Sequence, residues 1–158
     1  MWSSIRSRLS KEFTVRKLIA TGMVFFSCAA IAGERVLLMD QLPRFAGDTV
    51  KMQDMTYALY PDRPCDLPLV HAKDMNGGFV RYGDGPHKLC WGTTLRNDVV
   101  IVDDLGESAP PAPISAYRVA EISQPGSATI IKSMDNKKDY VPCPKSYGPD
   151  RWCRKGQN

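Results

Sequence analysis

Apolar and polar residues alternate in short runs along the chain after residue 33, and turn-forming residues separate these runs. A period of two places successive side chains on opposite faces of a β-strand, and β-branched and aromatic residues favour that conformation. Strands are therefore predicted at residues 48–60, 67–73, 79–82, 88–93, 99–102, 115–122 and 127–133. A spacing of about ten residues between short strands is typical of an antiparallel meander. The pattern predicts a mainly β fold, either a small antiparallel meander or a sandwich-like domain.

The segments between the predicted strands contain residues that reverse or interrupt a chain. Turns are predicted where Gly, Asn, Asp and Pro gather, at residues 76–78, 83–86, 97–98 and 106. Residues 109–113, rich in proline, are expected to form an extended connector. Residues 36–47 are expected to be an apolar lead-in, broken by Pro43 and Gly47. No segment carries a long amphipathic helical pattern, and residues 115–122 are where a helix competes best with the predicted strand.

The N-terminal segment differs from the rest of the chain. Residues 18–32 are fifteen residues without charge, preceded by a basic region at residues 2–17 and ending in Ala-Ile-Ala at residues 30–32. A transmembrane helix needs about 20 apolar residues, whereas this length, basic flank and ending are typical of a helical secretory signal. We expect a signal peptide that is cleaved after Ala32. An uncleaved short membrane anchor, a buried core helix and lipidation at Cys28 are the alternatives.

Composition indicates a globular protein with one domain. The chain has 158 residues, 43% of them hydrophobic, and a formal net charge of +4, values typical of a folded single domain. Residues 1–32 hold five bases and one acid and therefore carry the whole excess. The remaining residues, 33–158, hold 16 bases and 16 acids. A neutral exported chain is a poor partner for nucleic acid, so no nucleic-acid binding is expected.

Charge divides this neutral remainder into an acidic body and a basic end. Residues 33–131 hold nine bases and 13 acids, whereas residues 132–158 hold seven bases and three acids. The strand pattern ends near residue 133. Three parts are therefore predicted, which are a signal peptide at residues 1–32, a β-rich domain at 33–133 and a basic, disulfide-closed C-terminal segment at 134–158.

Four cysteines remain after the predicted cleavage, namely Cys65, Cys90, Cys143 and Cys153. An even number in an exported chain indicates two disulfides and an oxidising compartment, here the periplasm or cell envelope. Four cysteines allow three pairings, and local closure, the simplest topology, favours Cys65–Cys90 and Cys143–Cys153. This cysteine density is too low to replace a hydrophobic core.

The chain contains few residues that could support catalysis or bind a metal. It has two histidines, His71 and His87, and lacks a Gly-x-Ser-x-Gly motif, a phosphate-binding glycine motif and a paired Cys-x-x-Cys. His87 precedes Cys90 by three residues, which leaves zinc or an activated thiolate as alternatives, but a disulfide at Cys90 would remove both. Asp103 and Asp104 could supply paired carboxylates, but adjacent residues of a strand point to opposite faces. A solvated turn is therefore expected at these two residues. No catalytic residue, metal or cofactor is expected.

Candidate partner-binding residues lie within or next to the predicted loop between Cys143 and Cys153. They are the basic and aromatic residues Lys145, Tyr147, Arg151, Trp152 and Arg154. Such a loop is typical of a surface that contacts an anionic polymer or a protein. A polar tail that the disulfide only holds in place is the simpler alternative. The predicted hairpin tips between residues 77 and 86 are a second candidate surface.

Several features of residues 65–117 occur together in a known group of proteins. In chain order they are Cys65, Gly77, Cys90-Trp91, Asp98, the Val-rich run 99–102, Asp103-Asp104, Pro113 and Tyr117. This series resembles small exported bacterial proteins of uncharacterised function, in which a Cys-Trp pair precedes a Val-rich strand. The chain departs from them where a Trp and a Gly often flank the acidic turn. The resemblance implies an extracytoplasmic β-rich domain with one local disulfide, and it implies no catalytic residues.

The function expected from the sequence is a non-enzymatic binding or interaction module in the periplasm or cell envelope. Its expected partner is a protein of unknown identity or an anionic envelope polymer. The alternative is a membrane-anchored structural or exclusion factor, encoded by a bacterium, a phage or another mobile element. The membrane is a partner only if the signal is uncleaved. A Cys-His enzyme is the third class.

Overall fold

The computed structural model describes residues 33–144, 146 and 151–156. The predicted signal segment at residues 1–32 and the candidate residues Lys145 and Tyr147 lie outside the described residues. The described part is mainly β, as the alternating pattern predicts. Within these ranges no helix has the length and apolar character needed to cross a membrane.

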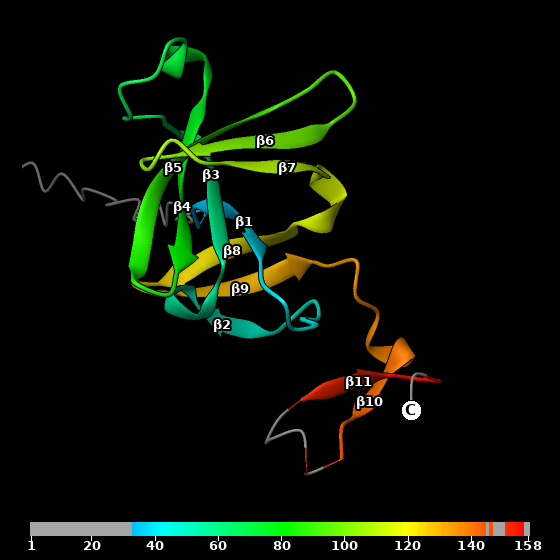
Figure 1. The fold of residues 1–158 in the computed structure, drawn as a ribbon. Helices are drawn as coiled ribbons and strands as arrows, with labels where there is room; N and C mark the ends of the chain where they lie inside the picture. The colour runs from blue at the N-terminus through cyan, green and yellow to red at the C-terminus, as the bar shows by residue number, and fades with distance from the viewer. Residues whose placement is uncertain (1–32, 145, 147–150, 157–158) are drawn as a thin grey trace, which may run out of the picture. The chain divides into compact units, whose positions relative to one another are not determined.

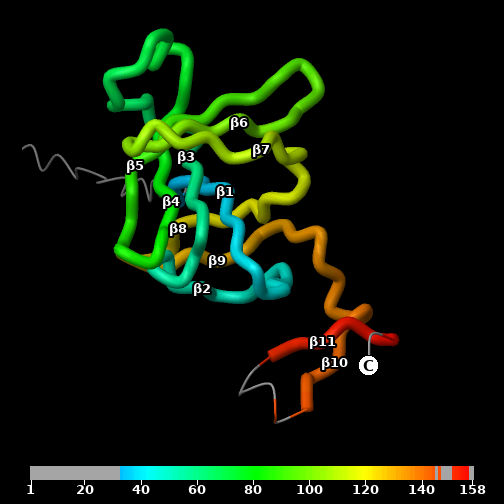
Figure 2. Tube along the Cα trace, viewed as in Figure 1, coloured from blue at the N-terminus to red at the C-terminus, as the bar shows by residue number. Residues whose placement is uncertain are grey.

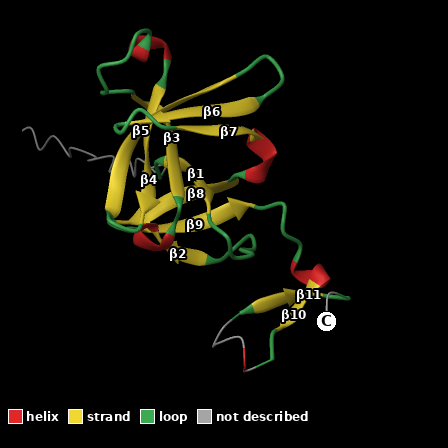
Figure 3. Ribbon diagram, viewed as in Figure 1, coloured by secondary structure: helices red, strands yellow, loops and turns green. Residues whose placement is uncertain are grey.

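Short strands make up most of the described chain (Figure 1). Their bounds are β1 Arg35–Met39, β2 Thr49–Lys51, β3 Tyr57–Pro64, β4 Asn76–Tyr82, β5 Gly85–Thr93, β6 Asp98–Asp103, β7 Ser108–Pro113, β8 Arg118–Gln124, β9 Ser127–Lys132, β10 Tyr140–Pro142 and β11 Trp152–Arg154. Single-turn 3-10 helices connect some of them, and these are η1 Met52–Asp54, η2 Ala72–Asp74, η3 Ile114–Ala116 and η4 Lys137–Asp139. Figure 3 shows how little helix the described chain contains. The competing helix at residues 115–122 is wrong, because a strand starts at Arg118.

Nine strands form one antiparallel sheet in the order β2-β9-β8-β1-β3-β4-β5-β6-β7, and β10 and β11 form a second, two-stranded sheet. Strands β3 to β7 are consecutive in both chain and sheet, which confirms the predicted meander. Strand β1 pairs with β3 on one side and with β8 on the other. The first strand of the described chain therefore lies in the middle of the sheet.

The central strands are buried on both faces. In β1, Val36 and Leu38 belong to one apolar cluster, whereas Leu37 between them belongs to another. In β3, Ala58 belongs to the first cluster and Leu59 to the second. Because successive side chains of a strand point to opposite faces, the two clusters lie on opposite faces of the same central strands.

Each end of the sheet completes one of the two clusters. Strands β2 and β9 and helix η1 add further residues to the first cluster, such as Val50, Met52 and Ile130. Strands β5 and β6 add further residues to the second, with β7 and η3 packed against it. Figure 2 shows β5, β6 and β7 on one side of the central strands and β2 and β9 on the other. The single sheet thus curls in opposite directions at its two ends.

Burial on both faces explains why the alternation of apolar and polar residues did not predict β1. Residues 36–47 were expected to be an apolar lead-in, but Arg35–Met39 is a strand with three consecutive buried residues. A strand that is covered on both faces reads as a continuous apolar run and shows no alternation. The prediction for residues 109–113 was also wrong, since Ser108–Pro113 is strand β7. Its prolines are compatible with a strand because β7 is at the edge of the sheet, where a missing N–H is tolerated.

The turn predicted at residues 76–78 is also wrong, because these residues begin β4. Gly77 and Gly78 are required here by close approach between strands. A Cβ on Gly78 would lie 2.6 Å from the Ala58 carbonyl oxygen, and one on Gly77 would lie 2.9 Å from the Pro64 carbonyl oxygen. Both distances are shorter than real Cβ contacts, so the two glycines allow β3 and β4 to pair tightly.

Two predicted strands are shorter than expected or absent. Residues 67–73 form a loop and the start of η2, with His71 in the left-handed conformation at a φ of 65°. The strand predicted at 48–60 is divided into β2 and β3 by η1. Met52 and Met55 lie in or next to this helix and are buried in the first cluster. The interruption therefore fills the core, which a period-two pattern does not reveal.

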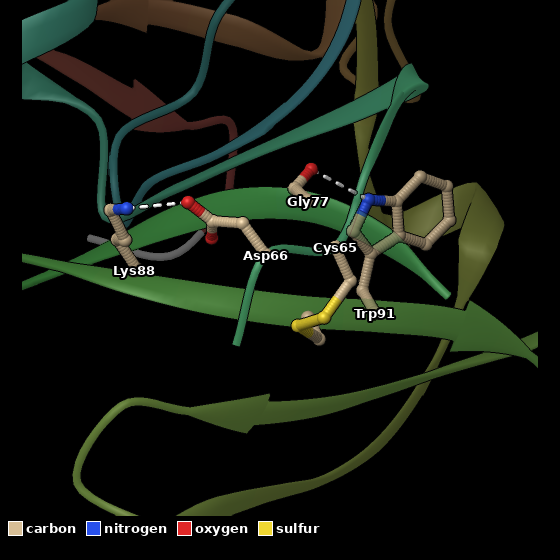
Figure 4. Close-up of a disulfide and its surroundings, with 6 residues drawn as sticks. Cys65, Asp66, Gly77, Lys88 and Trp91 are labelled. Atoms are coloured by element: carbon tan, nitrogen blue, oxygen red, sulfur yellow. Dashed lines mark hydrogen bonds and ion pairs between the residues drawn. A yellow bond between two sulfur atoms is a disulfide. The ribbon is translucent and has the colours of Figure 1, made fainter. Parts of the chain in front are cut away.

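Both disulfides of the favoured pairing are present, Cys65–Cys90 and Cys143–Cys153. Figure 4 shows the first of them beside Trp91, whose indole nitrogen donates a hydrogen bond to the Gly77 carbonyl oxygen at 3.2 Å. Cys90 is fully buried, so this bond joins the end of β3 to the interior of the sheet. Two disulfides in one small chain are typical of an oxidising compartment.

Candidate functional site

Strands β10 and β11, called the C-terminal hairpin below, pack on the sheet domain through one aromatic side chain. The Phe45 ring lies 5.5 Å from the Tyr140 ring and 5.3 Å from the Trp152 ring, both in edge-on geometry. Phe45 itself is 4% exposed. Edge-on aromatic pairs add about 0.5–1.5 kcal/mol to the burial of their area. Phe45 is therefore the apolar anchor of the hairpin.

An ion-pair cluster provides a second attachment between the hairpin and the sheet domain. Arg118 of β8 contacts Asp40 at 2.9 Å and Asp135 at 2.6 Å. Arg44 contacts Asp40 at 2.9 Å, and the Tyr140 hydroxyl donates a hydrogen bond to Asp135 at 2.8 Å. The Arg118 side chain is 11% exposed and that of Asp40 is 5% exposed. The cluster thus joins β8, the loop after β1 and the segment that leads into β10.

Asp135 is committed to this cluster in its charged form. Burial opposes ionisation, but hydrogen bonds from Arg118 and Tyr140 outweigh it, so the pKa of the Asp135 carboxyl lies below its ordinary value of 3.8. The hydrogen bond to Asp135, together with burial, raises the pKa of the Tyr140 hydroxyl. The carboxylate therefore balances Arg118 and is not available to neutralise neighbouring lysines.

The basic side chains of the C-terminal segment remain uncompensated. Those that the structure describes, together with Lys132 at the end of β9, are exposed and form no ion pair with a described residue. They are called the basic set: Lys132, Lys137, Lys138, Arg151, Arg154 and Lys155. The Lys137 ammonium lies 5.3 Å from the centre of the Trp152 ring and 5.9 Å from that of Phe45. A cation over these rings is stabilised by their negative faces. The segment therefore presents positive charge on a firmly attached scaffold.

The structure places three of the five candidate partner-binding residues, Arg151, Trp152 and Arg154, and does not bring all three to one face of the hairpin. Tyr140 pairs with Arg154, and Pro142 pairs with Trp152. Paired residues share a face of a sheet, so Arg154 and Trp152 lie on the face that packs against Phe45. Arg151, two residues before Cys153, lies on the opposite face. The hairpin therefore presents basic groups on both faces.

Trp152 has a different environment from the one expected of a partner-binding aromatic residue. It is only partly exposed and is held against Phe45 beneath the Lys137 ammonium. A groove of about 330 Å³ runs beside it, between the loop after β1 and the disulfide. The residues that line this groove are Gln41, Leu42, Pro43, Cys143, Arg151, Trp152 and Cys153. Arg151 is the charged residue of this lining.

A second polar cluster lies where the β4–β5 and β6–β7 turns meet. His87 Nδ1 is 2.9 Å from Asp104 and Nε2 is 3.2 Å from Asp84. Hydrogen bonding to Asp104, aided by Asp84, raises the pKa of the His87 imidazole. Its ring centre is 5.3 Å from that of Tyr82. Both ring nitrogens have carboxylate partners, so the histidine connects two turns and has no nitrogen left for a metal.

Asp103 corrects the expectation of a solvated turn. Its side chain is 2% exposed and accepts hydrogen bonds from the Tyr82 hydroxyl at 2.6 Å and from the backbone N–H groups of Leu105 and Glu107 at 3.0 and 2.8 Å. These bonds outweigh the burial of the carboxyl and hold its pKa below the ordinary value. Asp103 is therefore a structural residue that shapes the β6–β7 turn.

The arrangement at Cys90 does not support a thiolate nucleophile. The Cys90 sulfur is bonded to Cys65, and a disulfide sulfur can neither be activated by a base nor bind zinc. His87 and Cys90 are three residues apart on β5, so their side chains point to opposite faces. In the described ranges no group of three or more His, Cys, Asp and Glu side chains could hold a metal ion.

The residues that attach the hairpin were missed at the sequence level. Phe45 stands in a segment punctuated by Pro43 and Gly47, and Arg118 stands in a predicted strand. Their partners are far away in the chain, since Arg118 lies 78 residues from Asp40. No local pattern relates such residues. The one available signal is Arg118 next to the apolar residues Tyr117 and Val119 of a predicted strand, where a basic residue needs a partner if it is buried.

The chain matches no protein-family model, no curated protein and no solved structure. The resemblance of residues 65–117 to small exported bacterial proteins therefore stays a prediction.

Proposed function

We propose that this chain is an exported, non-enzymatic binding module whose basic set binds an anionic polymer of the cell envelope. One observation carries the proposal: the six exposed cations of the basic set lie near or within a hairpin that a disulfide, Phe45 and the Arg118 cluster hold in place. Fixed charges lose less conformational freedom on binding than those of a flexible tail. They also attract polyanions electrostatically over several ångströms, and dissolved salt weakens this attraction.

A polymer accounts for this surface better than a folded protein does. Protein interfaces concentrate their binding energy in exposed aromatic anchors, whereas Trp152 and Tyr140 are packed against Phe45. Basic residues lie on both faces of the hairpin, with Arg151 on one and Arg154 on the other. A rigid partner contacts one face, but a flexible polyanion can follow both.

Export is supported by the predicted signal at residues 1–32 and by the two disulfides. N-terminal sequencing of the chain recovered from a bacterial host tests it. A mature N-terminus at Gly33 is the expected result. An intact N-terminus in the membrane fraction would instead support the membrane-anchored structural or exclusion factor.

Binding is tested with fluorescent polyphosphate, polyglutamate as a second polyanion, and dextran as a neutral polymer. The full chain is expected to bind both polyanions and not dextran, with affinity that falls as salt rises. Replacing Lys138, Arg154 and Lys155 by Ala is expected to weaken polyphosphate binding about tenfold, since each exposed charge contributes about 0.5 kcal/mol.

The matched control removes three exposed bases from the sheet domain, Lys51, Lys73 and Arg96. This control variant changes the net charge by the same amount as the Lys138, Arg154 and Lys155 variant and leaves the basic set intact. The control is expected to bind nearly as tightly as the unchanged chain. Equal losses in both triple variants would show that net charge alone drives binding and would contradict the proposal.

A further inference from the structure

An apolar cavity of about 290 Å³ opens beside the second cluster and shares no lining residue with the groove beside Trp152. Its apolar lining includes Leu37 of β1, Val119 of β8, Ile114 and Tyr117. Ser115, Lys132, Ser133 and Met134 complete the lining. The volume is close to the lower limit of small-molecule sites, about 300 Å³. The cavity thus has the size for a small ligand.

Lys132 supplies the charge of this cavity, and a β-bulge brings it there. In the β8–β9 pair, Ala120 is opposite Ile130, and both are buried in the first cluster. The next pair is Val119 opposite Lys132, with Ile131 as the extra residue. Without the extra residue, Lys132 would share the face of Ile130, because residues two apart in a strand point the same way.

The bulge therefore moves Lys132 from the first face to the face of Val119, which lines the cavity. Ile131 is 48% exposed, as expected for the residue left out of the pairing. Bulges that redirect one side chain are frequent beside functional sites. Lys132 is also the charged member of the lining, which contains no carboxylate.

Tyr117 adds a hydrogen-bond donor to the lining. Its side chain is 5% exposed, and burial, with a smaller effect of nearby Tyr57, raises the pKa of its hydroxyl to about 12. The phenol is therefore protonated at neutral pH. A protonated hydroxyl and an ammonium next to apolar walls match one kind of ligand, an apolar chain or ring that ends in a carboxylate.

We infer that this cavity, called the β8–β9 pocket, binds a small apolar carboxylate such as a medium-chain fatty acid. The apolar part lies on Leu37, Val119 and Ile114, and the carboxylate is directed towards Lys132. Lys132 belongs to both proposals, but the five other members of the basic set lie outside this pocket, so the inference does not depend on polyanion binding. No covalent step is involved.

The test uses the full chain and three probes, octanoate, octanol and acetate. Titration is followed by the methyl NMR signals of Leu37 and Val119. Octanoate is expected to bind saturably and to shift both signals, octanol to bind about fivefold more weakly for lack of the ion pair, and acetate to leave the signals unchanged. Equal binding of octanoate and octanol would overturn the role of Lys132, and no shift with octanoate would overturn the pocket.

Three variants complete the experiment. Lys132→Met keeps the aliphatic stem and is expected to abolish the preference for octanoate over octanol, whereas Lys138→Met, outside the pocket, is expected to keep it. Met134→Trp fills the rim from an exposed position, so the fold is expected to survive while octanoate binding falls at least fivefold. Unchanged octanoate binding in Lys132→Met and Met134→Trp would contradict the inference. Polyphosphate binding in Met134→Trp is expected to be normal, which separates this site from the hairpin.

Discussion

The sheet domain and the C-terminal hairpin each contain one disulfide, yet different interactions hold them together. In the sheet, Cys90 is fully buried beside Leu89 and Trp91, and two apolar clusters cover both faces of the central strands. The hairpin has strands of three residues and depends on Phe45, Arg118 and Cys143–Cys153. An isolated two-stranded hairpin is at best marginally stable in water.

The comparison teaches that covalent and polar contacts replace a core where the chain is too short to form one. It also predicts two kinds of stability. The sheet should unfold cooperatively, because β1 and β3 contribute to both clusters. The hairpin should open locally, at a lower free energy than global unfolding.

The largest expected effect is the loss of a central core side chain. Leu38 is fully buried, and Leu38→Ala is expected to lower the free energy of unfolding by about 4 kcal/mol through lost burial and a new cavity. Urea denaturation measures the change. Ile131→Ala, on the exposed bulge, is the control, with an expected loss of about 0.5 kcal/mol. Similar losses in both variants would contradict the burial of Leu38 in the first cluster.

The next effect is removal of the buried cation that joins the two regions. Arg118→Met is expected to lower stability by about 3 kcal/mol, since it leaves Asp40 and Asp135 without their main partner. Hydrogen exchange at β10 and β11 is expected to accelerate. Arg63→Met removes an ion pair with Glu34 whose side chains are 50% and 34% exposed, and it should cost only about 0.5 kcal/mol. A fully protected hairpin in Arg118→Met would show that Phe45 alone attaches it.

The two disulfides are expected to stabilise the two regions to different extents. They close loops with sequence separations of 25 and 10 residues. Replacing Cys65 and Cys90 by Ala is expected to lower global stability by about 3 kcal/mol on the chain-entropy account. Replacing Cys143 and Cys153 by Ala is expected to leave global unfolding nearly unchanged and to accelerate hydrogen exchange in the hairpin alone. A large global loss in the second variant would mean that the hairpin unfolds together with the sheet.

The smallest expected effect is a pH dependence of opposite sign in the two regions. The raised pKa of His87 means that its charged form is stabilised by folding, so this contribution is complete below pH 6.5 and is lost as pH rises through the folded-state pKa. The lowered pKa of Asp135 means that folding stabilises its ionised form. This contribution to stability is present above pH 3.8 and is lost as pH falls through the folded-state pKa.

Thermal unfolding as a function of pH measures both contributions. His87→Gln is expected to flatten the dependence above pH 6.5 and leave the acid range unchanged. Asp135→Asn is expected to flatten the acid range, with the change seen in hydrogen exchange of the hairpin. A His87→Gln variant that keeps the full dependence above pH 6.5 would contradict the role given to the Asp84–His87–Asp104 contacts.

Prediction from sequence succeeded where the controlling interaction is local. Residues 88–93 and 99–102 lie within strands β5 and β6, as predicted, and Asn97 makes the predicted turn with a φ of 61°. It failed where a distant segment decides the environment. In the sequence, Gly77 and Gly78 indicate a turn, but in the structure they allow the close approach of β3. Asp103 likewise indicates a solvated turn, but in the structure it accepts a hydrogen bond from Tyr82.

The candidate site was predictable only in part for the same reason. The excess of basic residues after residue 131 and the closing disulfide are visible in the sequence. The burial of Trp152 on Phe45 and the capture of Asp135 by Arg118 are not, because these partners lie far apart in the chain.

By itself, the sequence determined the β-rich class, the acidic body with its basic end, and the local disulfide closure that the structure contains. Composition, charge and period-two alternation are properties of neighbouring residues, so they can be read without knowing the fold. The tertiary structure alone decided that β1 lies in the middle of the sheet, that both faces of the central strands are buried, and that a bulge at Ile131 turns Lys132 towards the β8–β9 pocket. These outcomes depend on strand order and register, which long-range pairing sets and which a shift of one residue reverses.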